Sequence, residues 1–154
     1  MTFNFISVNN KLSRWENEGL NYYVKQFPKH ISINFINIKG QQHPKRSINE
    51  IKELESNSIL AKINNNDLTI LFDIKGESLC SKTFSGIIKS SLENHKKTNF
   101  IIGGSFGVSD EVLNHSNKVI SISNMTFPHR LFKIILMEQI YRSFAIINNS
   151  PYHK

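Results

Sequence analysis

Short, uninterrupted apolar runs, separated by longer amphipathic segments, constrain the fold of this 154-residue chain most strongly. The runs Leu68–Phe72, Phe100–Ile102 and Val119–Ile122 are typical of strands buried on both faces, as in a parallel sheet. Two runs near the start, Phe3–Val8 and Ile31–Ile38, are rich in β-branched or aromatic residues and predict further strands. The chain is therefore predicted to adopt an α/β fold with a mainly parallel sheet.

The segments between these strands carry apolar residues at helical spacing. They predict helices over Leu12–Phe27, Ile48–Ile63 and Ser81–His95, with Pro28 ending the first helix. The chain has no internal repeat and no Gly/Ser linker, and its length suits one hydrophobic core. We therefore expect a single domain over residues 1–154.

The segment Arg130–Phe144 predicts a helix that is apolar nearly all round. Phe132, Leu136, Ile140 and Phe144 form one stripe at a spacing of four residues, and further apolar residues cover much of the rest. A sheet can cover only one side of such a helix. A second subunit is the natural cover for the other side, which favours a homodimer. The alternative is a helix enclosed by other elements of the same chain.

The formal net charge is +7 and the isoelectric point is near 9.6. A basic surface favours a polyanionic partner, and Lys29, His30, Lys45 and Arg46 are candidates to contact RNA phosphates. A genome that favours lysine codons would give the same charge, so charge alone does not identify the partner.

One cysteine, Cys80, excludes an internal disulfide and suits a reducing cytoplasm. The start of the chain reads as a strand rather than a signal peptide. No apolar run approaches the ~20 residues that span a bilayer, so we expect no membrane association.

Two loops follow neighbouring strands and are candidates for a binding site. Gly103, Gly104 and Gly107 follow one strand, and the segment Ser123–Pro128 follows the next. Ligands of open α/β sheets bind in such crevices. Neither a dinucleotide-binding G-x-G-x-x-G nor a P-loop is present, so an adenosine-bearing ligand without phosphates fits best. A β-branched residue in place of Gly104 should then block the adenosine by occupying its space.

Each of these features also has a purely structural explanation. Glycine clusters at strand ends are commonly only turns, and Thr126 could cap the helix that begins near Pro128. The histidines have no metal-ligand spacing, so no metal site is expected. The terminal Pro151–Lys154 carries an aromatic ring, an imidazole and a cation, although chain ends are usually frayed. We expect this tail to be docked and used; the alternative is that it serves only packing.

With these residues in view, the chain resembles the RlmH family of ribosomal RNA large-subunit methyltransferases, a branch of the SPOUT or α/β-knotted class. The resemblance spans the whole chain. It depends on motifs in the family's order and spacing: Phe27–Lys29, Asp73–Gly76, Ile102–Gly104 with Gly107, Met125–His129, Glu138–Arg142 and Pro151–His153.

The resemblance implies a SPOUT α/β knot with a C-terminal trefoil knot. It also implies transfer of a methyl group from S-adenosylmethionine to N3 of a pseudouridine in a 23S rRNA stem-loop on the assembled ribosome. It implies a cofactor site made of Phe72, Gly103, Gly104, Ser123, Asn124, Met125, Thr126, Phe127 and Pro128. It further implies catalytic roles for Tyr152 and His153, and RNA contacts by His129, Arg142 and Lys154.

Two departures from the family pattern limit what is carried over. Many relatives have Pro-Glu where Ser105 and Phe106 stand, so no acidic role is assigned to that turn. Many have His where Ser150 stands, so only Tyr152 and His153 inherit roles in the tail. Two alternatives stay open: a binding module without catalysis, and a SPOUT enzyme that acts on tRNA.

Overall fold

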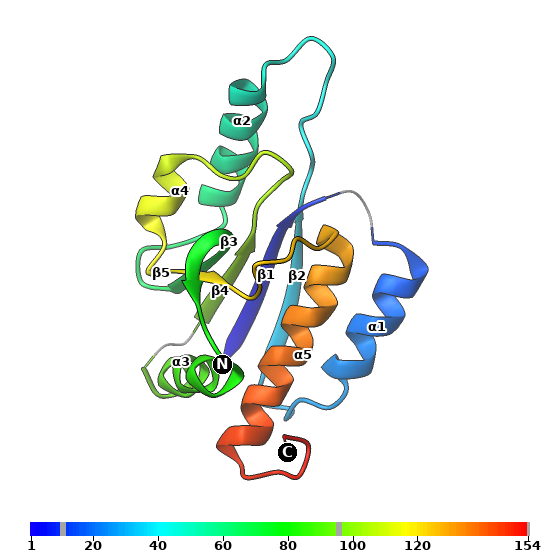
Figure 1. Ribbon diagram of the computed structural model, residues 1–154, viewed down its shortest axis with the longest axis vertical. Coiled ribbons are helices and arrows are strands. Elements are labelled where there is room, and N and C mark those ends of the chain that lie inside the picture. Colours follow the sequence, from blue (N-terminus) through cyan, green and yellow to red (C-terminus); the bar gives the residue numbers. More distant parts are fainter. Residues whose placement is uncertain (10–11, 95–96, 154) are drawn as a thin grey trace.

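The computed structural model describes residues 1–9, 12–94 and 97–153. Its centre is a five-stranded sheet in which all neighbouring strands are parallel, in the order β2-β1-β4-β3-β5 (Figure 1). The strands are β1 Thr2–Val8, β2 Ser32–Ile38, β3 Leu68–Ser78, β4 Lys97–Ile102 and β5 Lys118–Ser121. The predicted α/β fold with a parallel sheet is confirmed.

Helices cover both faces of the sheet. In the described part of the chain they are α1 Arg14–Val24, α2 Ile48–Leu60, α3 Ser81–Asn94, α4 Asp110–His115 and α5 His129–Ile147. Successive strand residues point to opposite faces, so Phe5 packs with α1, α3 and α5, whereas Ile6 packs with α2 and α4. Both faces are therefore apolar, which explains the continuous apolar runs of the central strands.

The starts of α1 and α2 follow from a Ser-x-x-Glu pattern in the sequence. The carboxylate of Glu16 accepts a hydrogen bond from the Ser13 amide at 2.9 Å. Glu50 accepts one from the Ser47 amide at 2.7 Å, and the Ser47 hydroxyl accepts one from the Glu50 amide at 3.2 Å. These side chains satisfy N–H groups that have no partner within the helix.

A row of amide side chains crosses the sheet near the amino ends of its strands. Asn34 donates to Asn4 at 3.0 Å, Asn4 donates to Asn99 at 2.8 Å, and Asn99 donates to Asp67 at 3.1 Å. Asn4 pairs in register with both Asn34 and Asn99. Because Asn4 and Asn99 are buried, a slip of register would leave buried amides without partners.

The structure departs from the predicted elements in several places, among them α2, which ends at Leu60 rather than at the predicted Ile63. The short helix α4 was not predicted. The first helix is shorter than predicted, and His95, the predicted end of the third, lies outside the described residues. The strand predicted to end at Phe72 continues to Ser78, because Phe72 and Glu77 both pair with Ile120 and the residues between them bulge out. Gly76 lies in this bulge, where a Cβ atom would come within 2.6 Å of the Ile120 backbone.

Helix α5 packs on the sheet and lies between α1 and α3 of the same chain (Figure 1). The premise that only the sheet would cover it is therefore wrong, because α1 and α3 cover its flanks. The alternative, a helix enclosed by other elements of the same chain, explains much of the apolar surface of α5. Both the homodimer and the trefoil knot stay predictions.

Candidate functional site

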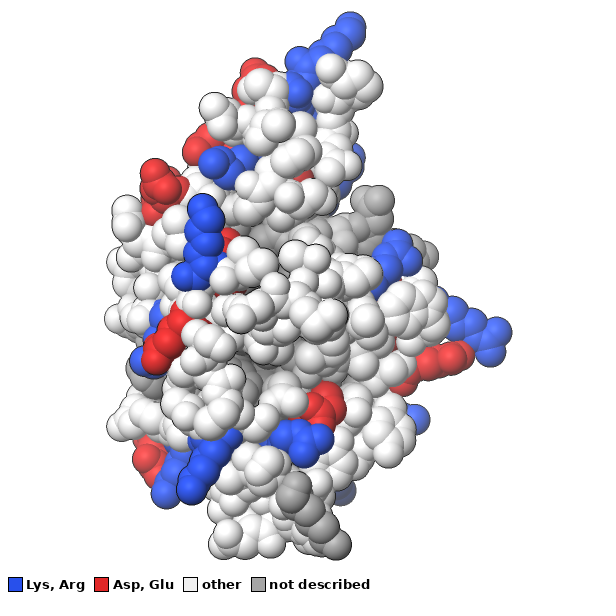
Figure 2. Space-filling view, viewed as in Figure 1, with Lys and Arg blue, Asp and Glu red and all other residues white. Residues whose placement is uncertain are grey.

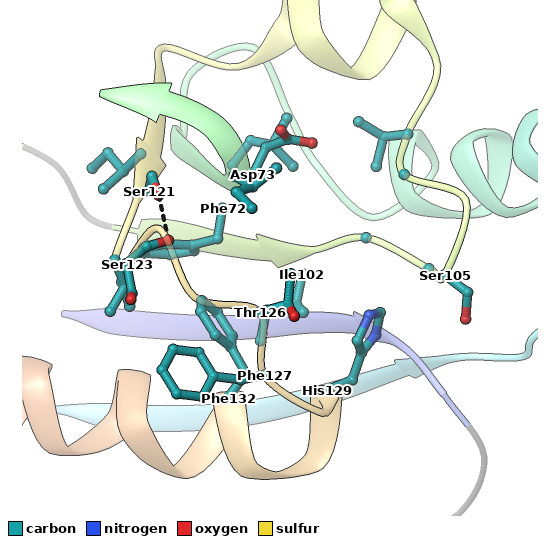
Figure 3. A pocket seen from close by; sticks show the side chains of 18 of the residues that line it. Phe72, Asp73, Ile102, Ser105, Ser121, Ser123, Thr126, Phe127, His129 and Phe132 are labelled. Atoms are coloured by element: carbon teal, nitrogen blue, oxygen red, sulfur yellow. Dashed lines mark hydrogen bonds between the residues drawn. The ribbon is translucent and has the colours of Figure 1, made fainter. Parts of the chain in front are cut away.

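A cavity of about 300 Å³ opens at the carboxyl ends of β3, β4 and β5 (Figure 3). Eight of the predicted cofactor and RNA residues line it: Phe72, Gly103, Gly104, Ser123, Met125, Thr126, Phe127 and His129. Asn124 and Pro128 do not. Asp73, Ser105, Ile122 and Phe132 also line the cavity, and no sequence motif predicted them as ligand contacts. The crevice predicted between the glycine turn and the Ser123–Pro128 loop is therefore present.

The glycine turn forms one wall of this cavity. The Gly107 amide donates to the Gly104 carbonyl at 3.0 Å, and Gly107 has a φ of +78°, a conformation that favours glycine. A Cβ atom on Gly104 would overlap Oε2 of Glu55, a buried residue of α2 that does not line the cavity. The prediction that a side chain at Gly104 would fill the adenosine's space is therefore wrong: it would enter space that Glu55 holds.

The loop between β5 and α5 forms the facing wall. Ser121 donates to the Ser123 carbonyl at 3.0 Å, and the Ser123 hydroxyl accepts from the Met125 amide at 2.9 Å. The Met125 side chain is 72% exposed at the cavity mouth. The N-cap of α5 is Pro128, without a side-chain hydrogen bond, so the alternative role of Thr126 as the helix cap is wrong. Thr126 is instead part of the cavity wall.

His129 is the titratable imidazole of the cavity wall. Burial lowers its pKa; the Val8 carbonyl and Glu55 oppose this shift, and the charge of Lys133 adds to it. The ring is therefore neutral at pH 7 and can both donate and accept a hydrogen bond. Figure 3 shows Phe127 and Phe132 together, with His129 and Ser105 toward one side. The described residues contain no cluster of side chains that could hold a metal ion.

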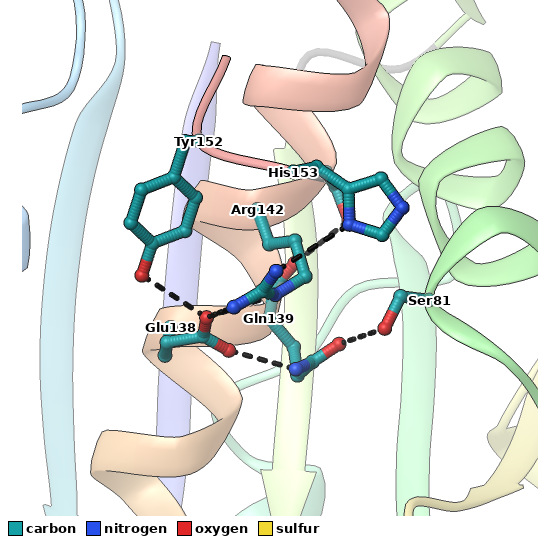
Figure 4. Close-up of polar contacts among 7 residues, drawn as sticks. Ser81, Glu138, Gln139, Arg142, Tyr152 and His153 are labelled. Carbon is teal, nitrogen blue, oxygen red and sulfur yellow. Dashed lines mark hydrogen bonds and ion pairs between the residues drawn. The ribbon is translucent and has the colours of Figure 1, made fainter. Parts of the chain in front are cut away.

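The tail forms a second cluster, on α5 (Figure 4). The Tyr152 hydroxyl donates to Oε1 of Glu138 at 3.1 Å, and its ring packs edge-on against Tyr141 with the centroids 4.8 Å apart. Arg142 donates to the same Glu138 oxygen, and its guanidinium carbon lies 5.0 Å from the centroid of the Tyr152 ring. The Arg142 guanidinium also lies 3.4 Å from Nδ1 of His153. The tail is docked, as expected.

The remaining contacts of Glu138 extend this cluster to α3. Its other oxygen accepts a hydrogen bond from Gln139 at 2.7 Å, and Gln139 accepts one from the Ser81 hydroxyl at 2.7 Å. Burial raises the pKa of Tyr152, and contacts with Tyr23 and Glu138 raise it further. The phenol therefore stays protonated at neutral pH and acts as a hydrogen-bond donor in this arrangement.

The cavity and the tail cluster lie along different parts of α5. His129 and Phe132 line the cavity, whereas the tail contacts Glu138 and Arg142; at a rise of about 1.5 Å per residue these lie about 9 and about 15 Å along the axis from Phe132. Neither Tyr152 nor His153 lines the cavity. The structure therefore does not bring Tyr152 and His153 to the cavity of their own chain. Lys154, the third residue assigned to RNA, lies outside the described residues.

The four basic residues proposed to contact RNA are exposed, but they lie in separate segments. Lys29 and His30 follow α1, whereas Lys45 and Arg46 belong to the loop between β2 and α2. Figure 2 shows basic side chains at the tip of the molecule above α2, where this loop projects in Figure 1. Among the described residues, no helix combines the length and the hydropathy needed to cross a bilayer.

Comparison with known proteins is consistent with this geometry. A family model described as a predicted SPOUT methyltransferase matches residues 1–153. Proteins named ribosomal RNA large subunit methyltransferase H are similar over their whole length and that of this chain. Those of Clostridium botulinum strains Langeland and Kyoto are 38% identical, and that of Clostridium acetobutylicum is 36% identical.

Proposed function

Because this chain belongs to the SPOUT methyltransferase family, we propose that it transfers a methyl group from S-adenosylmethionine to N3 of a pseudouridine in a 23S rRNA stem-loop of the assembled ribosome. The observation that supports this most directly is the cavity at the carboxyl ends of β3, β4 and β5. It has aromatic walls, backbone amides from a glycine turn and no carboxylate pair, which suits an uncharged adenosine. The reaction belongs to the cytoplasm, where ribosomes assemble.

S-adenosylmethionine supplies a methyl group bonded to a positively charged sulfur. Phe72, Phe127 and Met125 offer apolar contacts for the adenosine, and the backbone of Gly103 and Gly104 can approach it closely. Thr126 and Ser123 offer hydroxyl groups at the same wall. The role of this chain is then to position the cofactor and the target base, and positioning alone can lower the barrier by several kcal/mol.

The tail supplies the chemistry that the cavity lacks. During transfer the bond from sulfur to carbon breaks, a bond from carbon to N3 forms, and the N3 proton must leave. Because Tyr152 stays protonated, we assign it to orient or stack on the base, and we assign His153 to accept the proton or to contact the imide edge. Arg142 and Lys154 would hold the RNA backbone.

We infer that the tail acts on the cavity of a second copy of the chain. Neither Tyr152 nor His153 lines the cavity of its own chain, and the tail docks at Glu138, about 9 Å along α5 from the cavity residue Phe132. A homodimer in which the two chains lie antiparallel along α5 removes this separation. The proposed active site is therefore composite, with the cofactor on one subunit and the tail from the other.

Mass mapping of ribosomal RNA tests the substrate. A strain without the gene should lack one methyl group on a 23S rRNA pseudouridine, and the purified protein with S-adenosylmethionine should restore it on ribosomes from that strain. A change confined to tRNA would instead favour a SPOUT enzyme that acts on tRNA. Absence of S-adenosylmethionine binding in calorimetry would favour a binding module without catalysis.

Truncation after Ser150 tests the role of the tail. We expect the truncated protein to bind S-adenosylmethionine with unchanged affinity, because the residues that line the cofactor cavity all lie between Leu71 and Phe132, and to lose methylation. Calorimetry and incorporation of labelled methyl groups into ribosomes measure the two properties. A truncated protein that methylates at the normal rate would show that the tail serves only packing.

A further inference from the structure

Glu55 is a buried carboxylate behind the cavity wall, and the effect of its charge on His129 does not account for its contacts with Gln41 and Gly104. Its side chain is 3% exposed, in the middle of the polar sequence of α2. Its Oε1 accepts a hydrogen bond from the Gln41 amide at 2.8 Å. Its Oε2 lies against Gly104 and has no hydrogen-bond partner among the described residues. One side chain thus contacts the wall of the cavity and the loop that follows β2.

That loop, residues 39–46, has the sequence Lys-Gly-Gln-Gln-His-Pro-Lys-Arg and contains no acidic residue. Residues 42–46 are exposed, Gly40 and Gln41 are partly buried, and hydrogen bonds link residues within the loop. Arg46 donates through Nη1 to both the backbone and the side-chain oxygen of Gln41, at 3.0 and 2.9 Å. The amides of Arg46 and Lys45 donate to the carbonyl and Nδ1 of His43, at 3.0 and 3.2 Å.

These contacts form a continuous path from the cavity wall to an exposed cation. The carboxylate of Glu55 lies against Gly104 and accepts a hydrogen bond from the Gln41 amide. Gln41 in turn accepts a hydrogen bond from the Arg46 guanidinium. A loop fixed before it binds loses less conformational entropy on binding. The loop itself carries Lys39, Lys45 and Arg46 and no carboxylate, although the charge of Arg46 also acts on Glu50 of α2, and exposed cations of this kind suit a chain of phosphates.

We propose that residues 39–46 form a preorganised phosphate-binding arm for RNA, and that Glu55 is the positioning residue that fixes this arm relative to the cofactor cavity. The inference rests on the proposed function, from which it takes RNA as the partner. Beyond the proposed function, it identifies a surface that binds RNA phosphates and explains why a carboxylate is buried behind the glycine turn. Glu55 acts through Gln41 and does not touch RNA.

The first test measures the arm. Binding of a transcript of the 23S rRNA stem-loop is followed from 50 to 200 mM KCl for Lys45→Ala/Arg46→Ala. A matched control, Lys62→Ala/Lys89→Ala, removes two exposed cations that lie outside the arm. Each lost phosphate contact should reduce the slope of log affinity against log salt by about 0.7 to 0.9. We expect the arm variant to lose about 1.5 from the slope and the control to keep it. Equal salt slopes in the two variants would show that residues 39–46 do not bind RNA phosphates.

The second test measures positioning. Glu55→Gln and Glu55→Ala remove the same charge, but glutamine keeps an oxygen that can accept from the Gln41 amide. Loss of a negative charge alone would strengthen RNA binding equally in both variants. We expect Glu55→Ala to bind the transcript about tenfold more weakly than Glu55→Gln, because its arm is no longer held. Equal affinities would remove Glu55 from this role.

A third pair of variants keeps the proposal testable if Glu55→Ala does not fold. Gln41→Ala removes one acceptor of the Arg46 guanidinium, and Gln42→Ala removes an exposed neighbour of the same type. We expect only Gln41→Ala to weaken RNA binding, with S-adenosylmethionine affinity unchanged in both. If the wild-type protein methylates ribosomes and these two variants bind RNA equally well, the inference is wrong and the proposed function is retained. If the wild-type protein binds the transcript through the arm but never methylates it, the proposed function is wrong and the arm is retained.

Discussion

Gly104 shows how one atom can decide the shape of the cavity wall. Added to Gly104, a Cβ atom would overlap the carboxylate of Glu55 and come within 3.3 Å of Val8. The nearest atom is the carboxylate end of the buried Glu55 side chain, so either this carboxylate or the glycine turn must shift. The residue is therefore a glycine because of what lies behind the wall, and a substitution reaches the cofactor indirectly.

We predict that Gly104→Ala weakens S-adenosylmethionine binding at least about tenfold, since the turn that presents its amides is displaced. Gly86→Ala is the matched control, because a Cβ atom there meets nothing within 4 Å and Gly86 lies inside α3. The control should keep its affinity and gain up to about 1 kcal/mol of stability. Calorimetric titration and urea unfolding measure the two effects. Unchanged affinity in Gly104→Ala would show that the Glu55 carboxylate, rather than the turn, gives way to the added atom.

At the scale of the elements, α1 and α5 are joined by a buried ion pair. Nζ of Lys133 lies 3.4 Å from Oε1 of Glu16, and Nε of Arg130 lies 3.5 Å from Oε2. Burial alone would raise the pKa of Glu16, but the Ser13 amide and hydroxyl and the charge of Lys133 lower it overall. Replacing one partner leaves the other charge buried alone.

We predict that Glu16→Gln lowers the free energy of unfolding by about 3 kcal/mol at pH 7, and that adding Lys133→Met recovers most of it. A carboxylate with a lowered native pKa stabilises the fold above its unfolded pKa, near 4.5, and loses this effect as pH falls through the native value. The difference between wild type and Glu16→Gln should therefore shrink below about pH 4. Urea unfolding from pH 3 to 7 measures it. A constant difference would exclude a charged Glu16.

At the scale of the whole molecule, α5 carries both halves of one proposed site. The cavity lies at His129 and the tail cluster at Glu138 and Arg142, so under the proposed function neither chain completes a site alone. This arrangement makes the oligomeric state a requirement for activity rather than a detail of packing. Light scattering at low micromolar concentration should show a dimer. An active monomer would contradict the composite site.

Complementation tests this arrangement directly. One variant with a defective cavity, Gly104→Val, is mixed and refolded with one truncated after Ser150. If the tail acts across the dimer, a mixed dimer has one intact site and one site with both defects. Half of the dimers are then mixed, so about a quarter of the wild-type activity should return. If each tail served its own chain, every site would have a defect and the mixture would stay inactive.

The sequence by itself determined the sheet, most of the helices and the place of the cavity, because these follow from local patterns. Apolar runs such as Leu68–Phe72 define strands, and glycines after a strand mark a turn at the sheet edge. It did not reveal the short helix α4, which carries too few apolar residues to produce a period. It also placed the end of a strand at Phe72, because the bulge before Glu77 is fixed by pairing with Ile120, a residue distant in the sequence.

Only the tertiary structure decided how distant residues meet. Glu55 lies four residues after Ile51 and four before Ile59, so helical spacing places it on the buried side of α2, but only the folded structure brings it against Gly104 and Gln41. The amides of Asn4 and Asn99 become one ladder only when β1 and β4 pair. Likewise the tail motif named Tyr152 and His153, but the folded chain docks them on α5 at Glu138 and Arg142, and neither lines the cavity. Local propensity fixes elements, whereas burial and long-range pairing are properties of the folded chain as a whole.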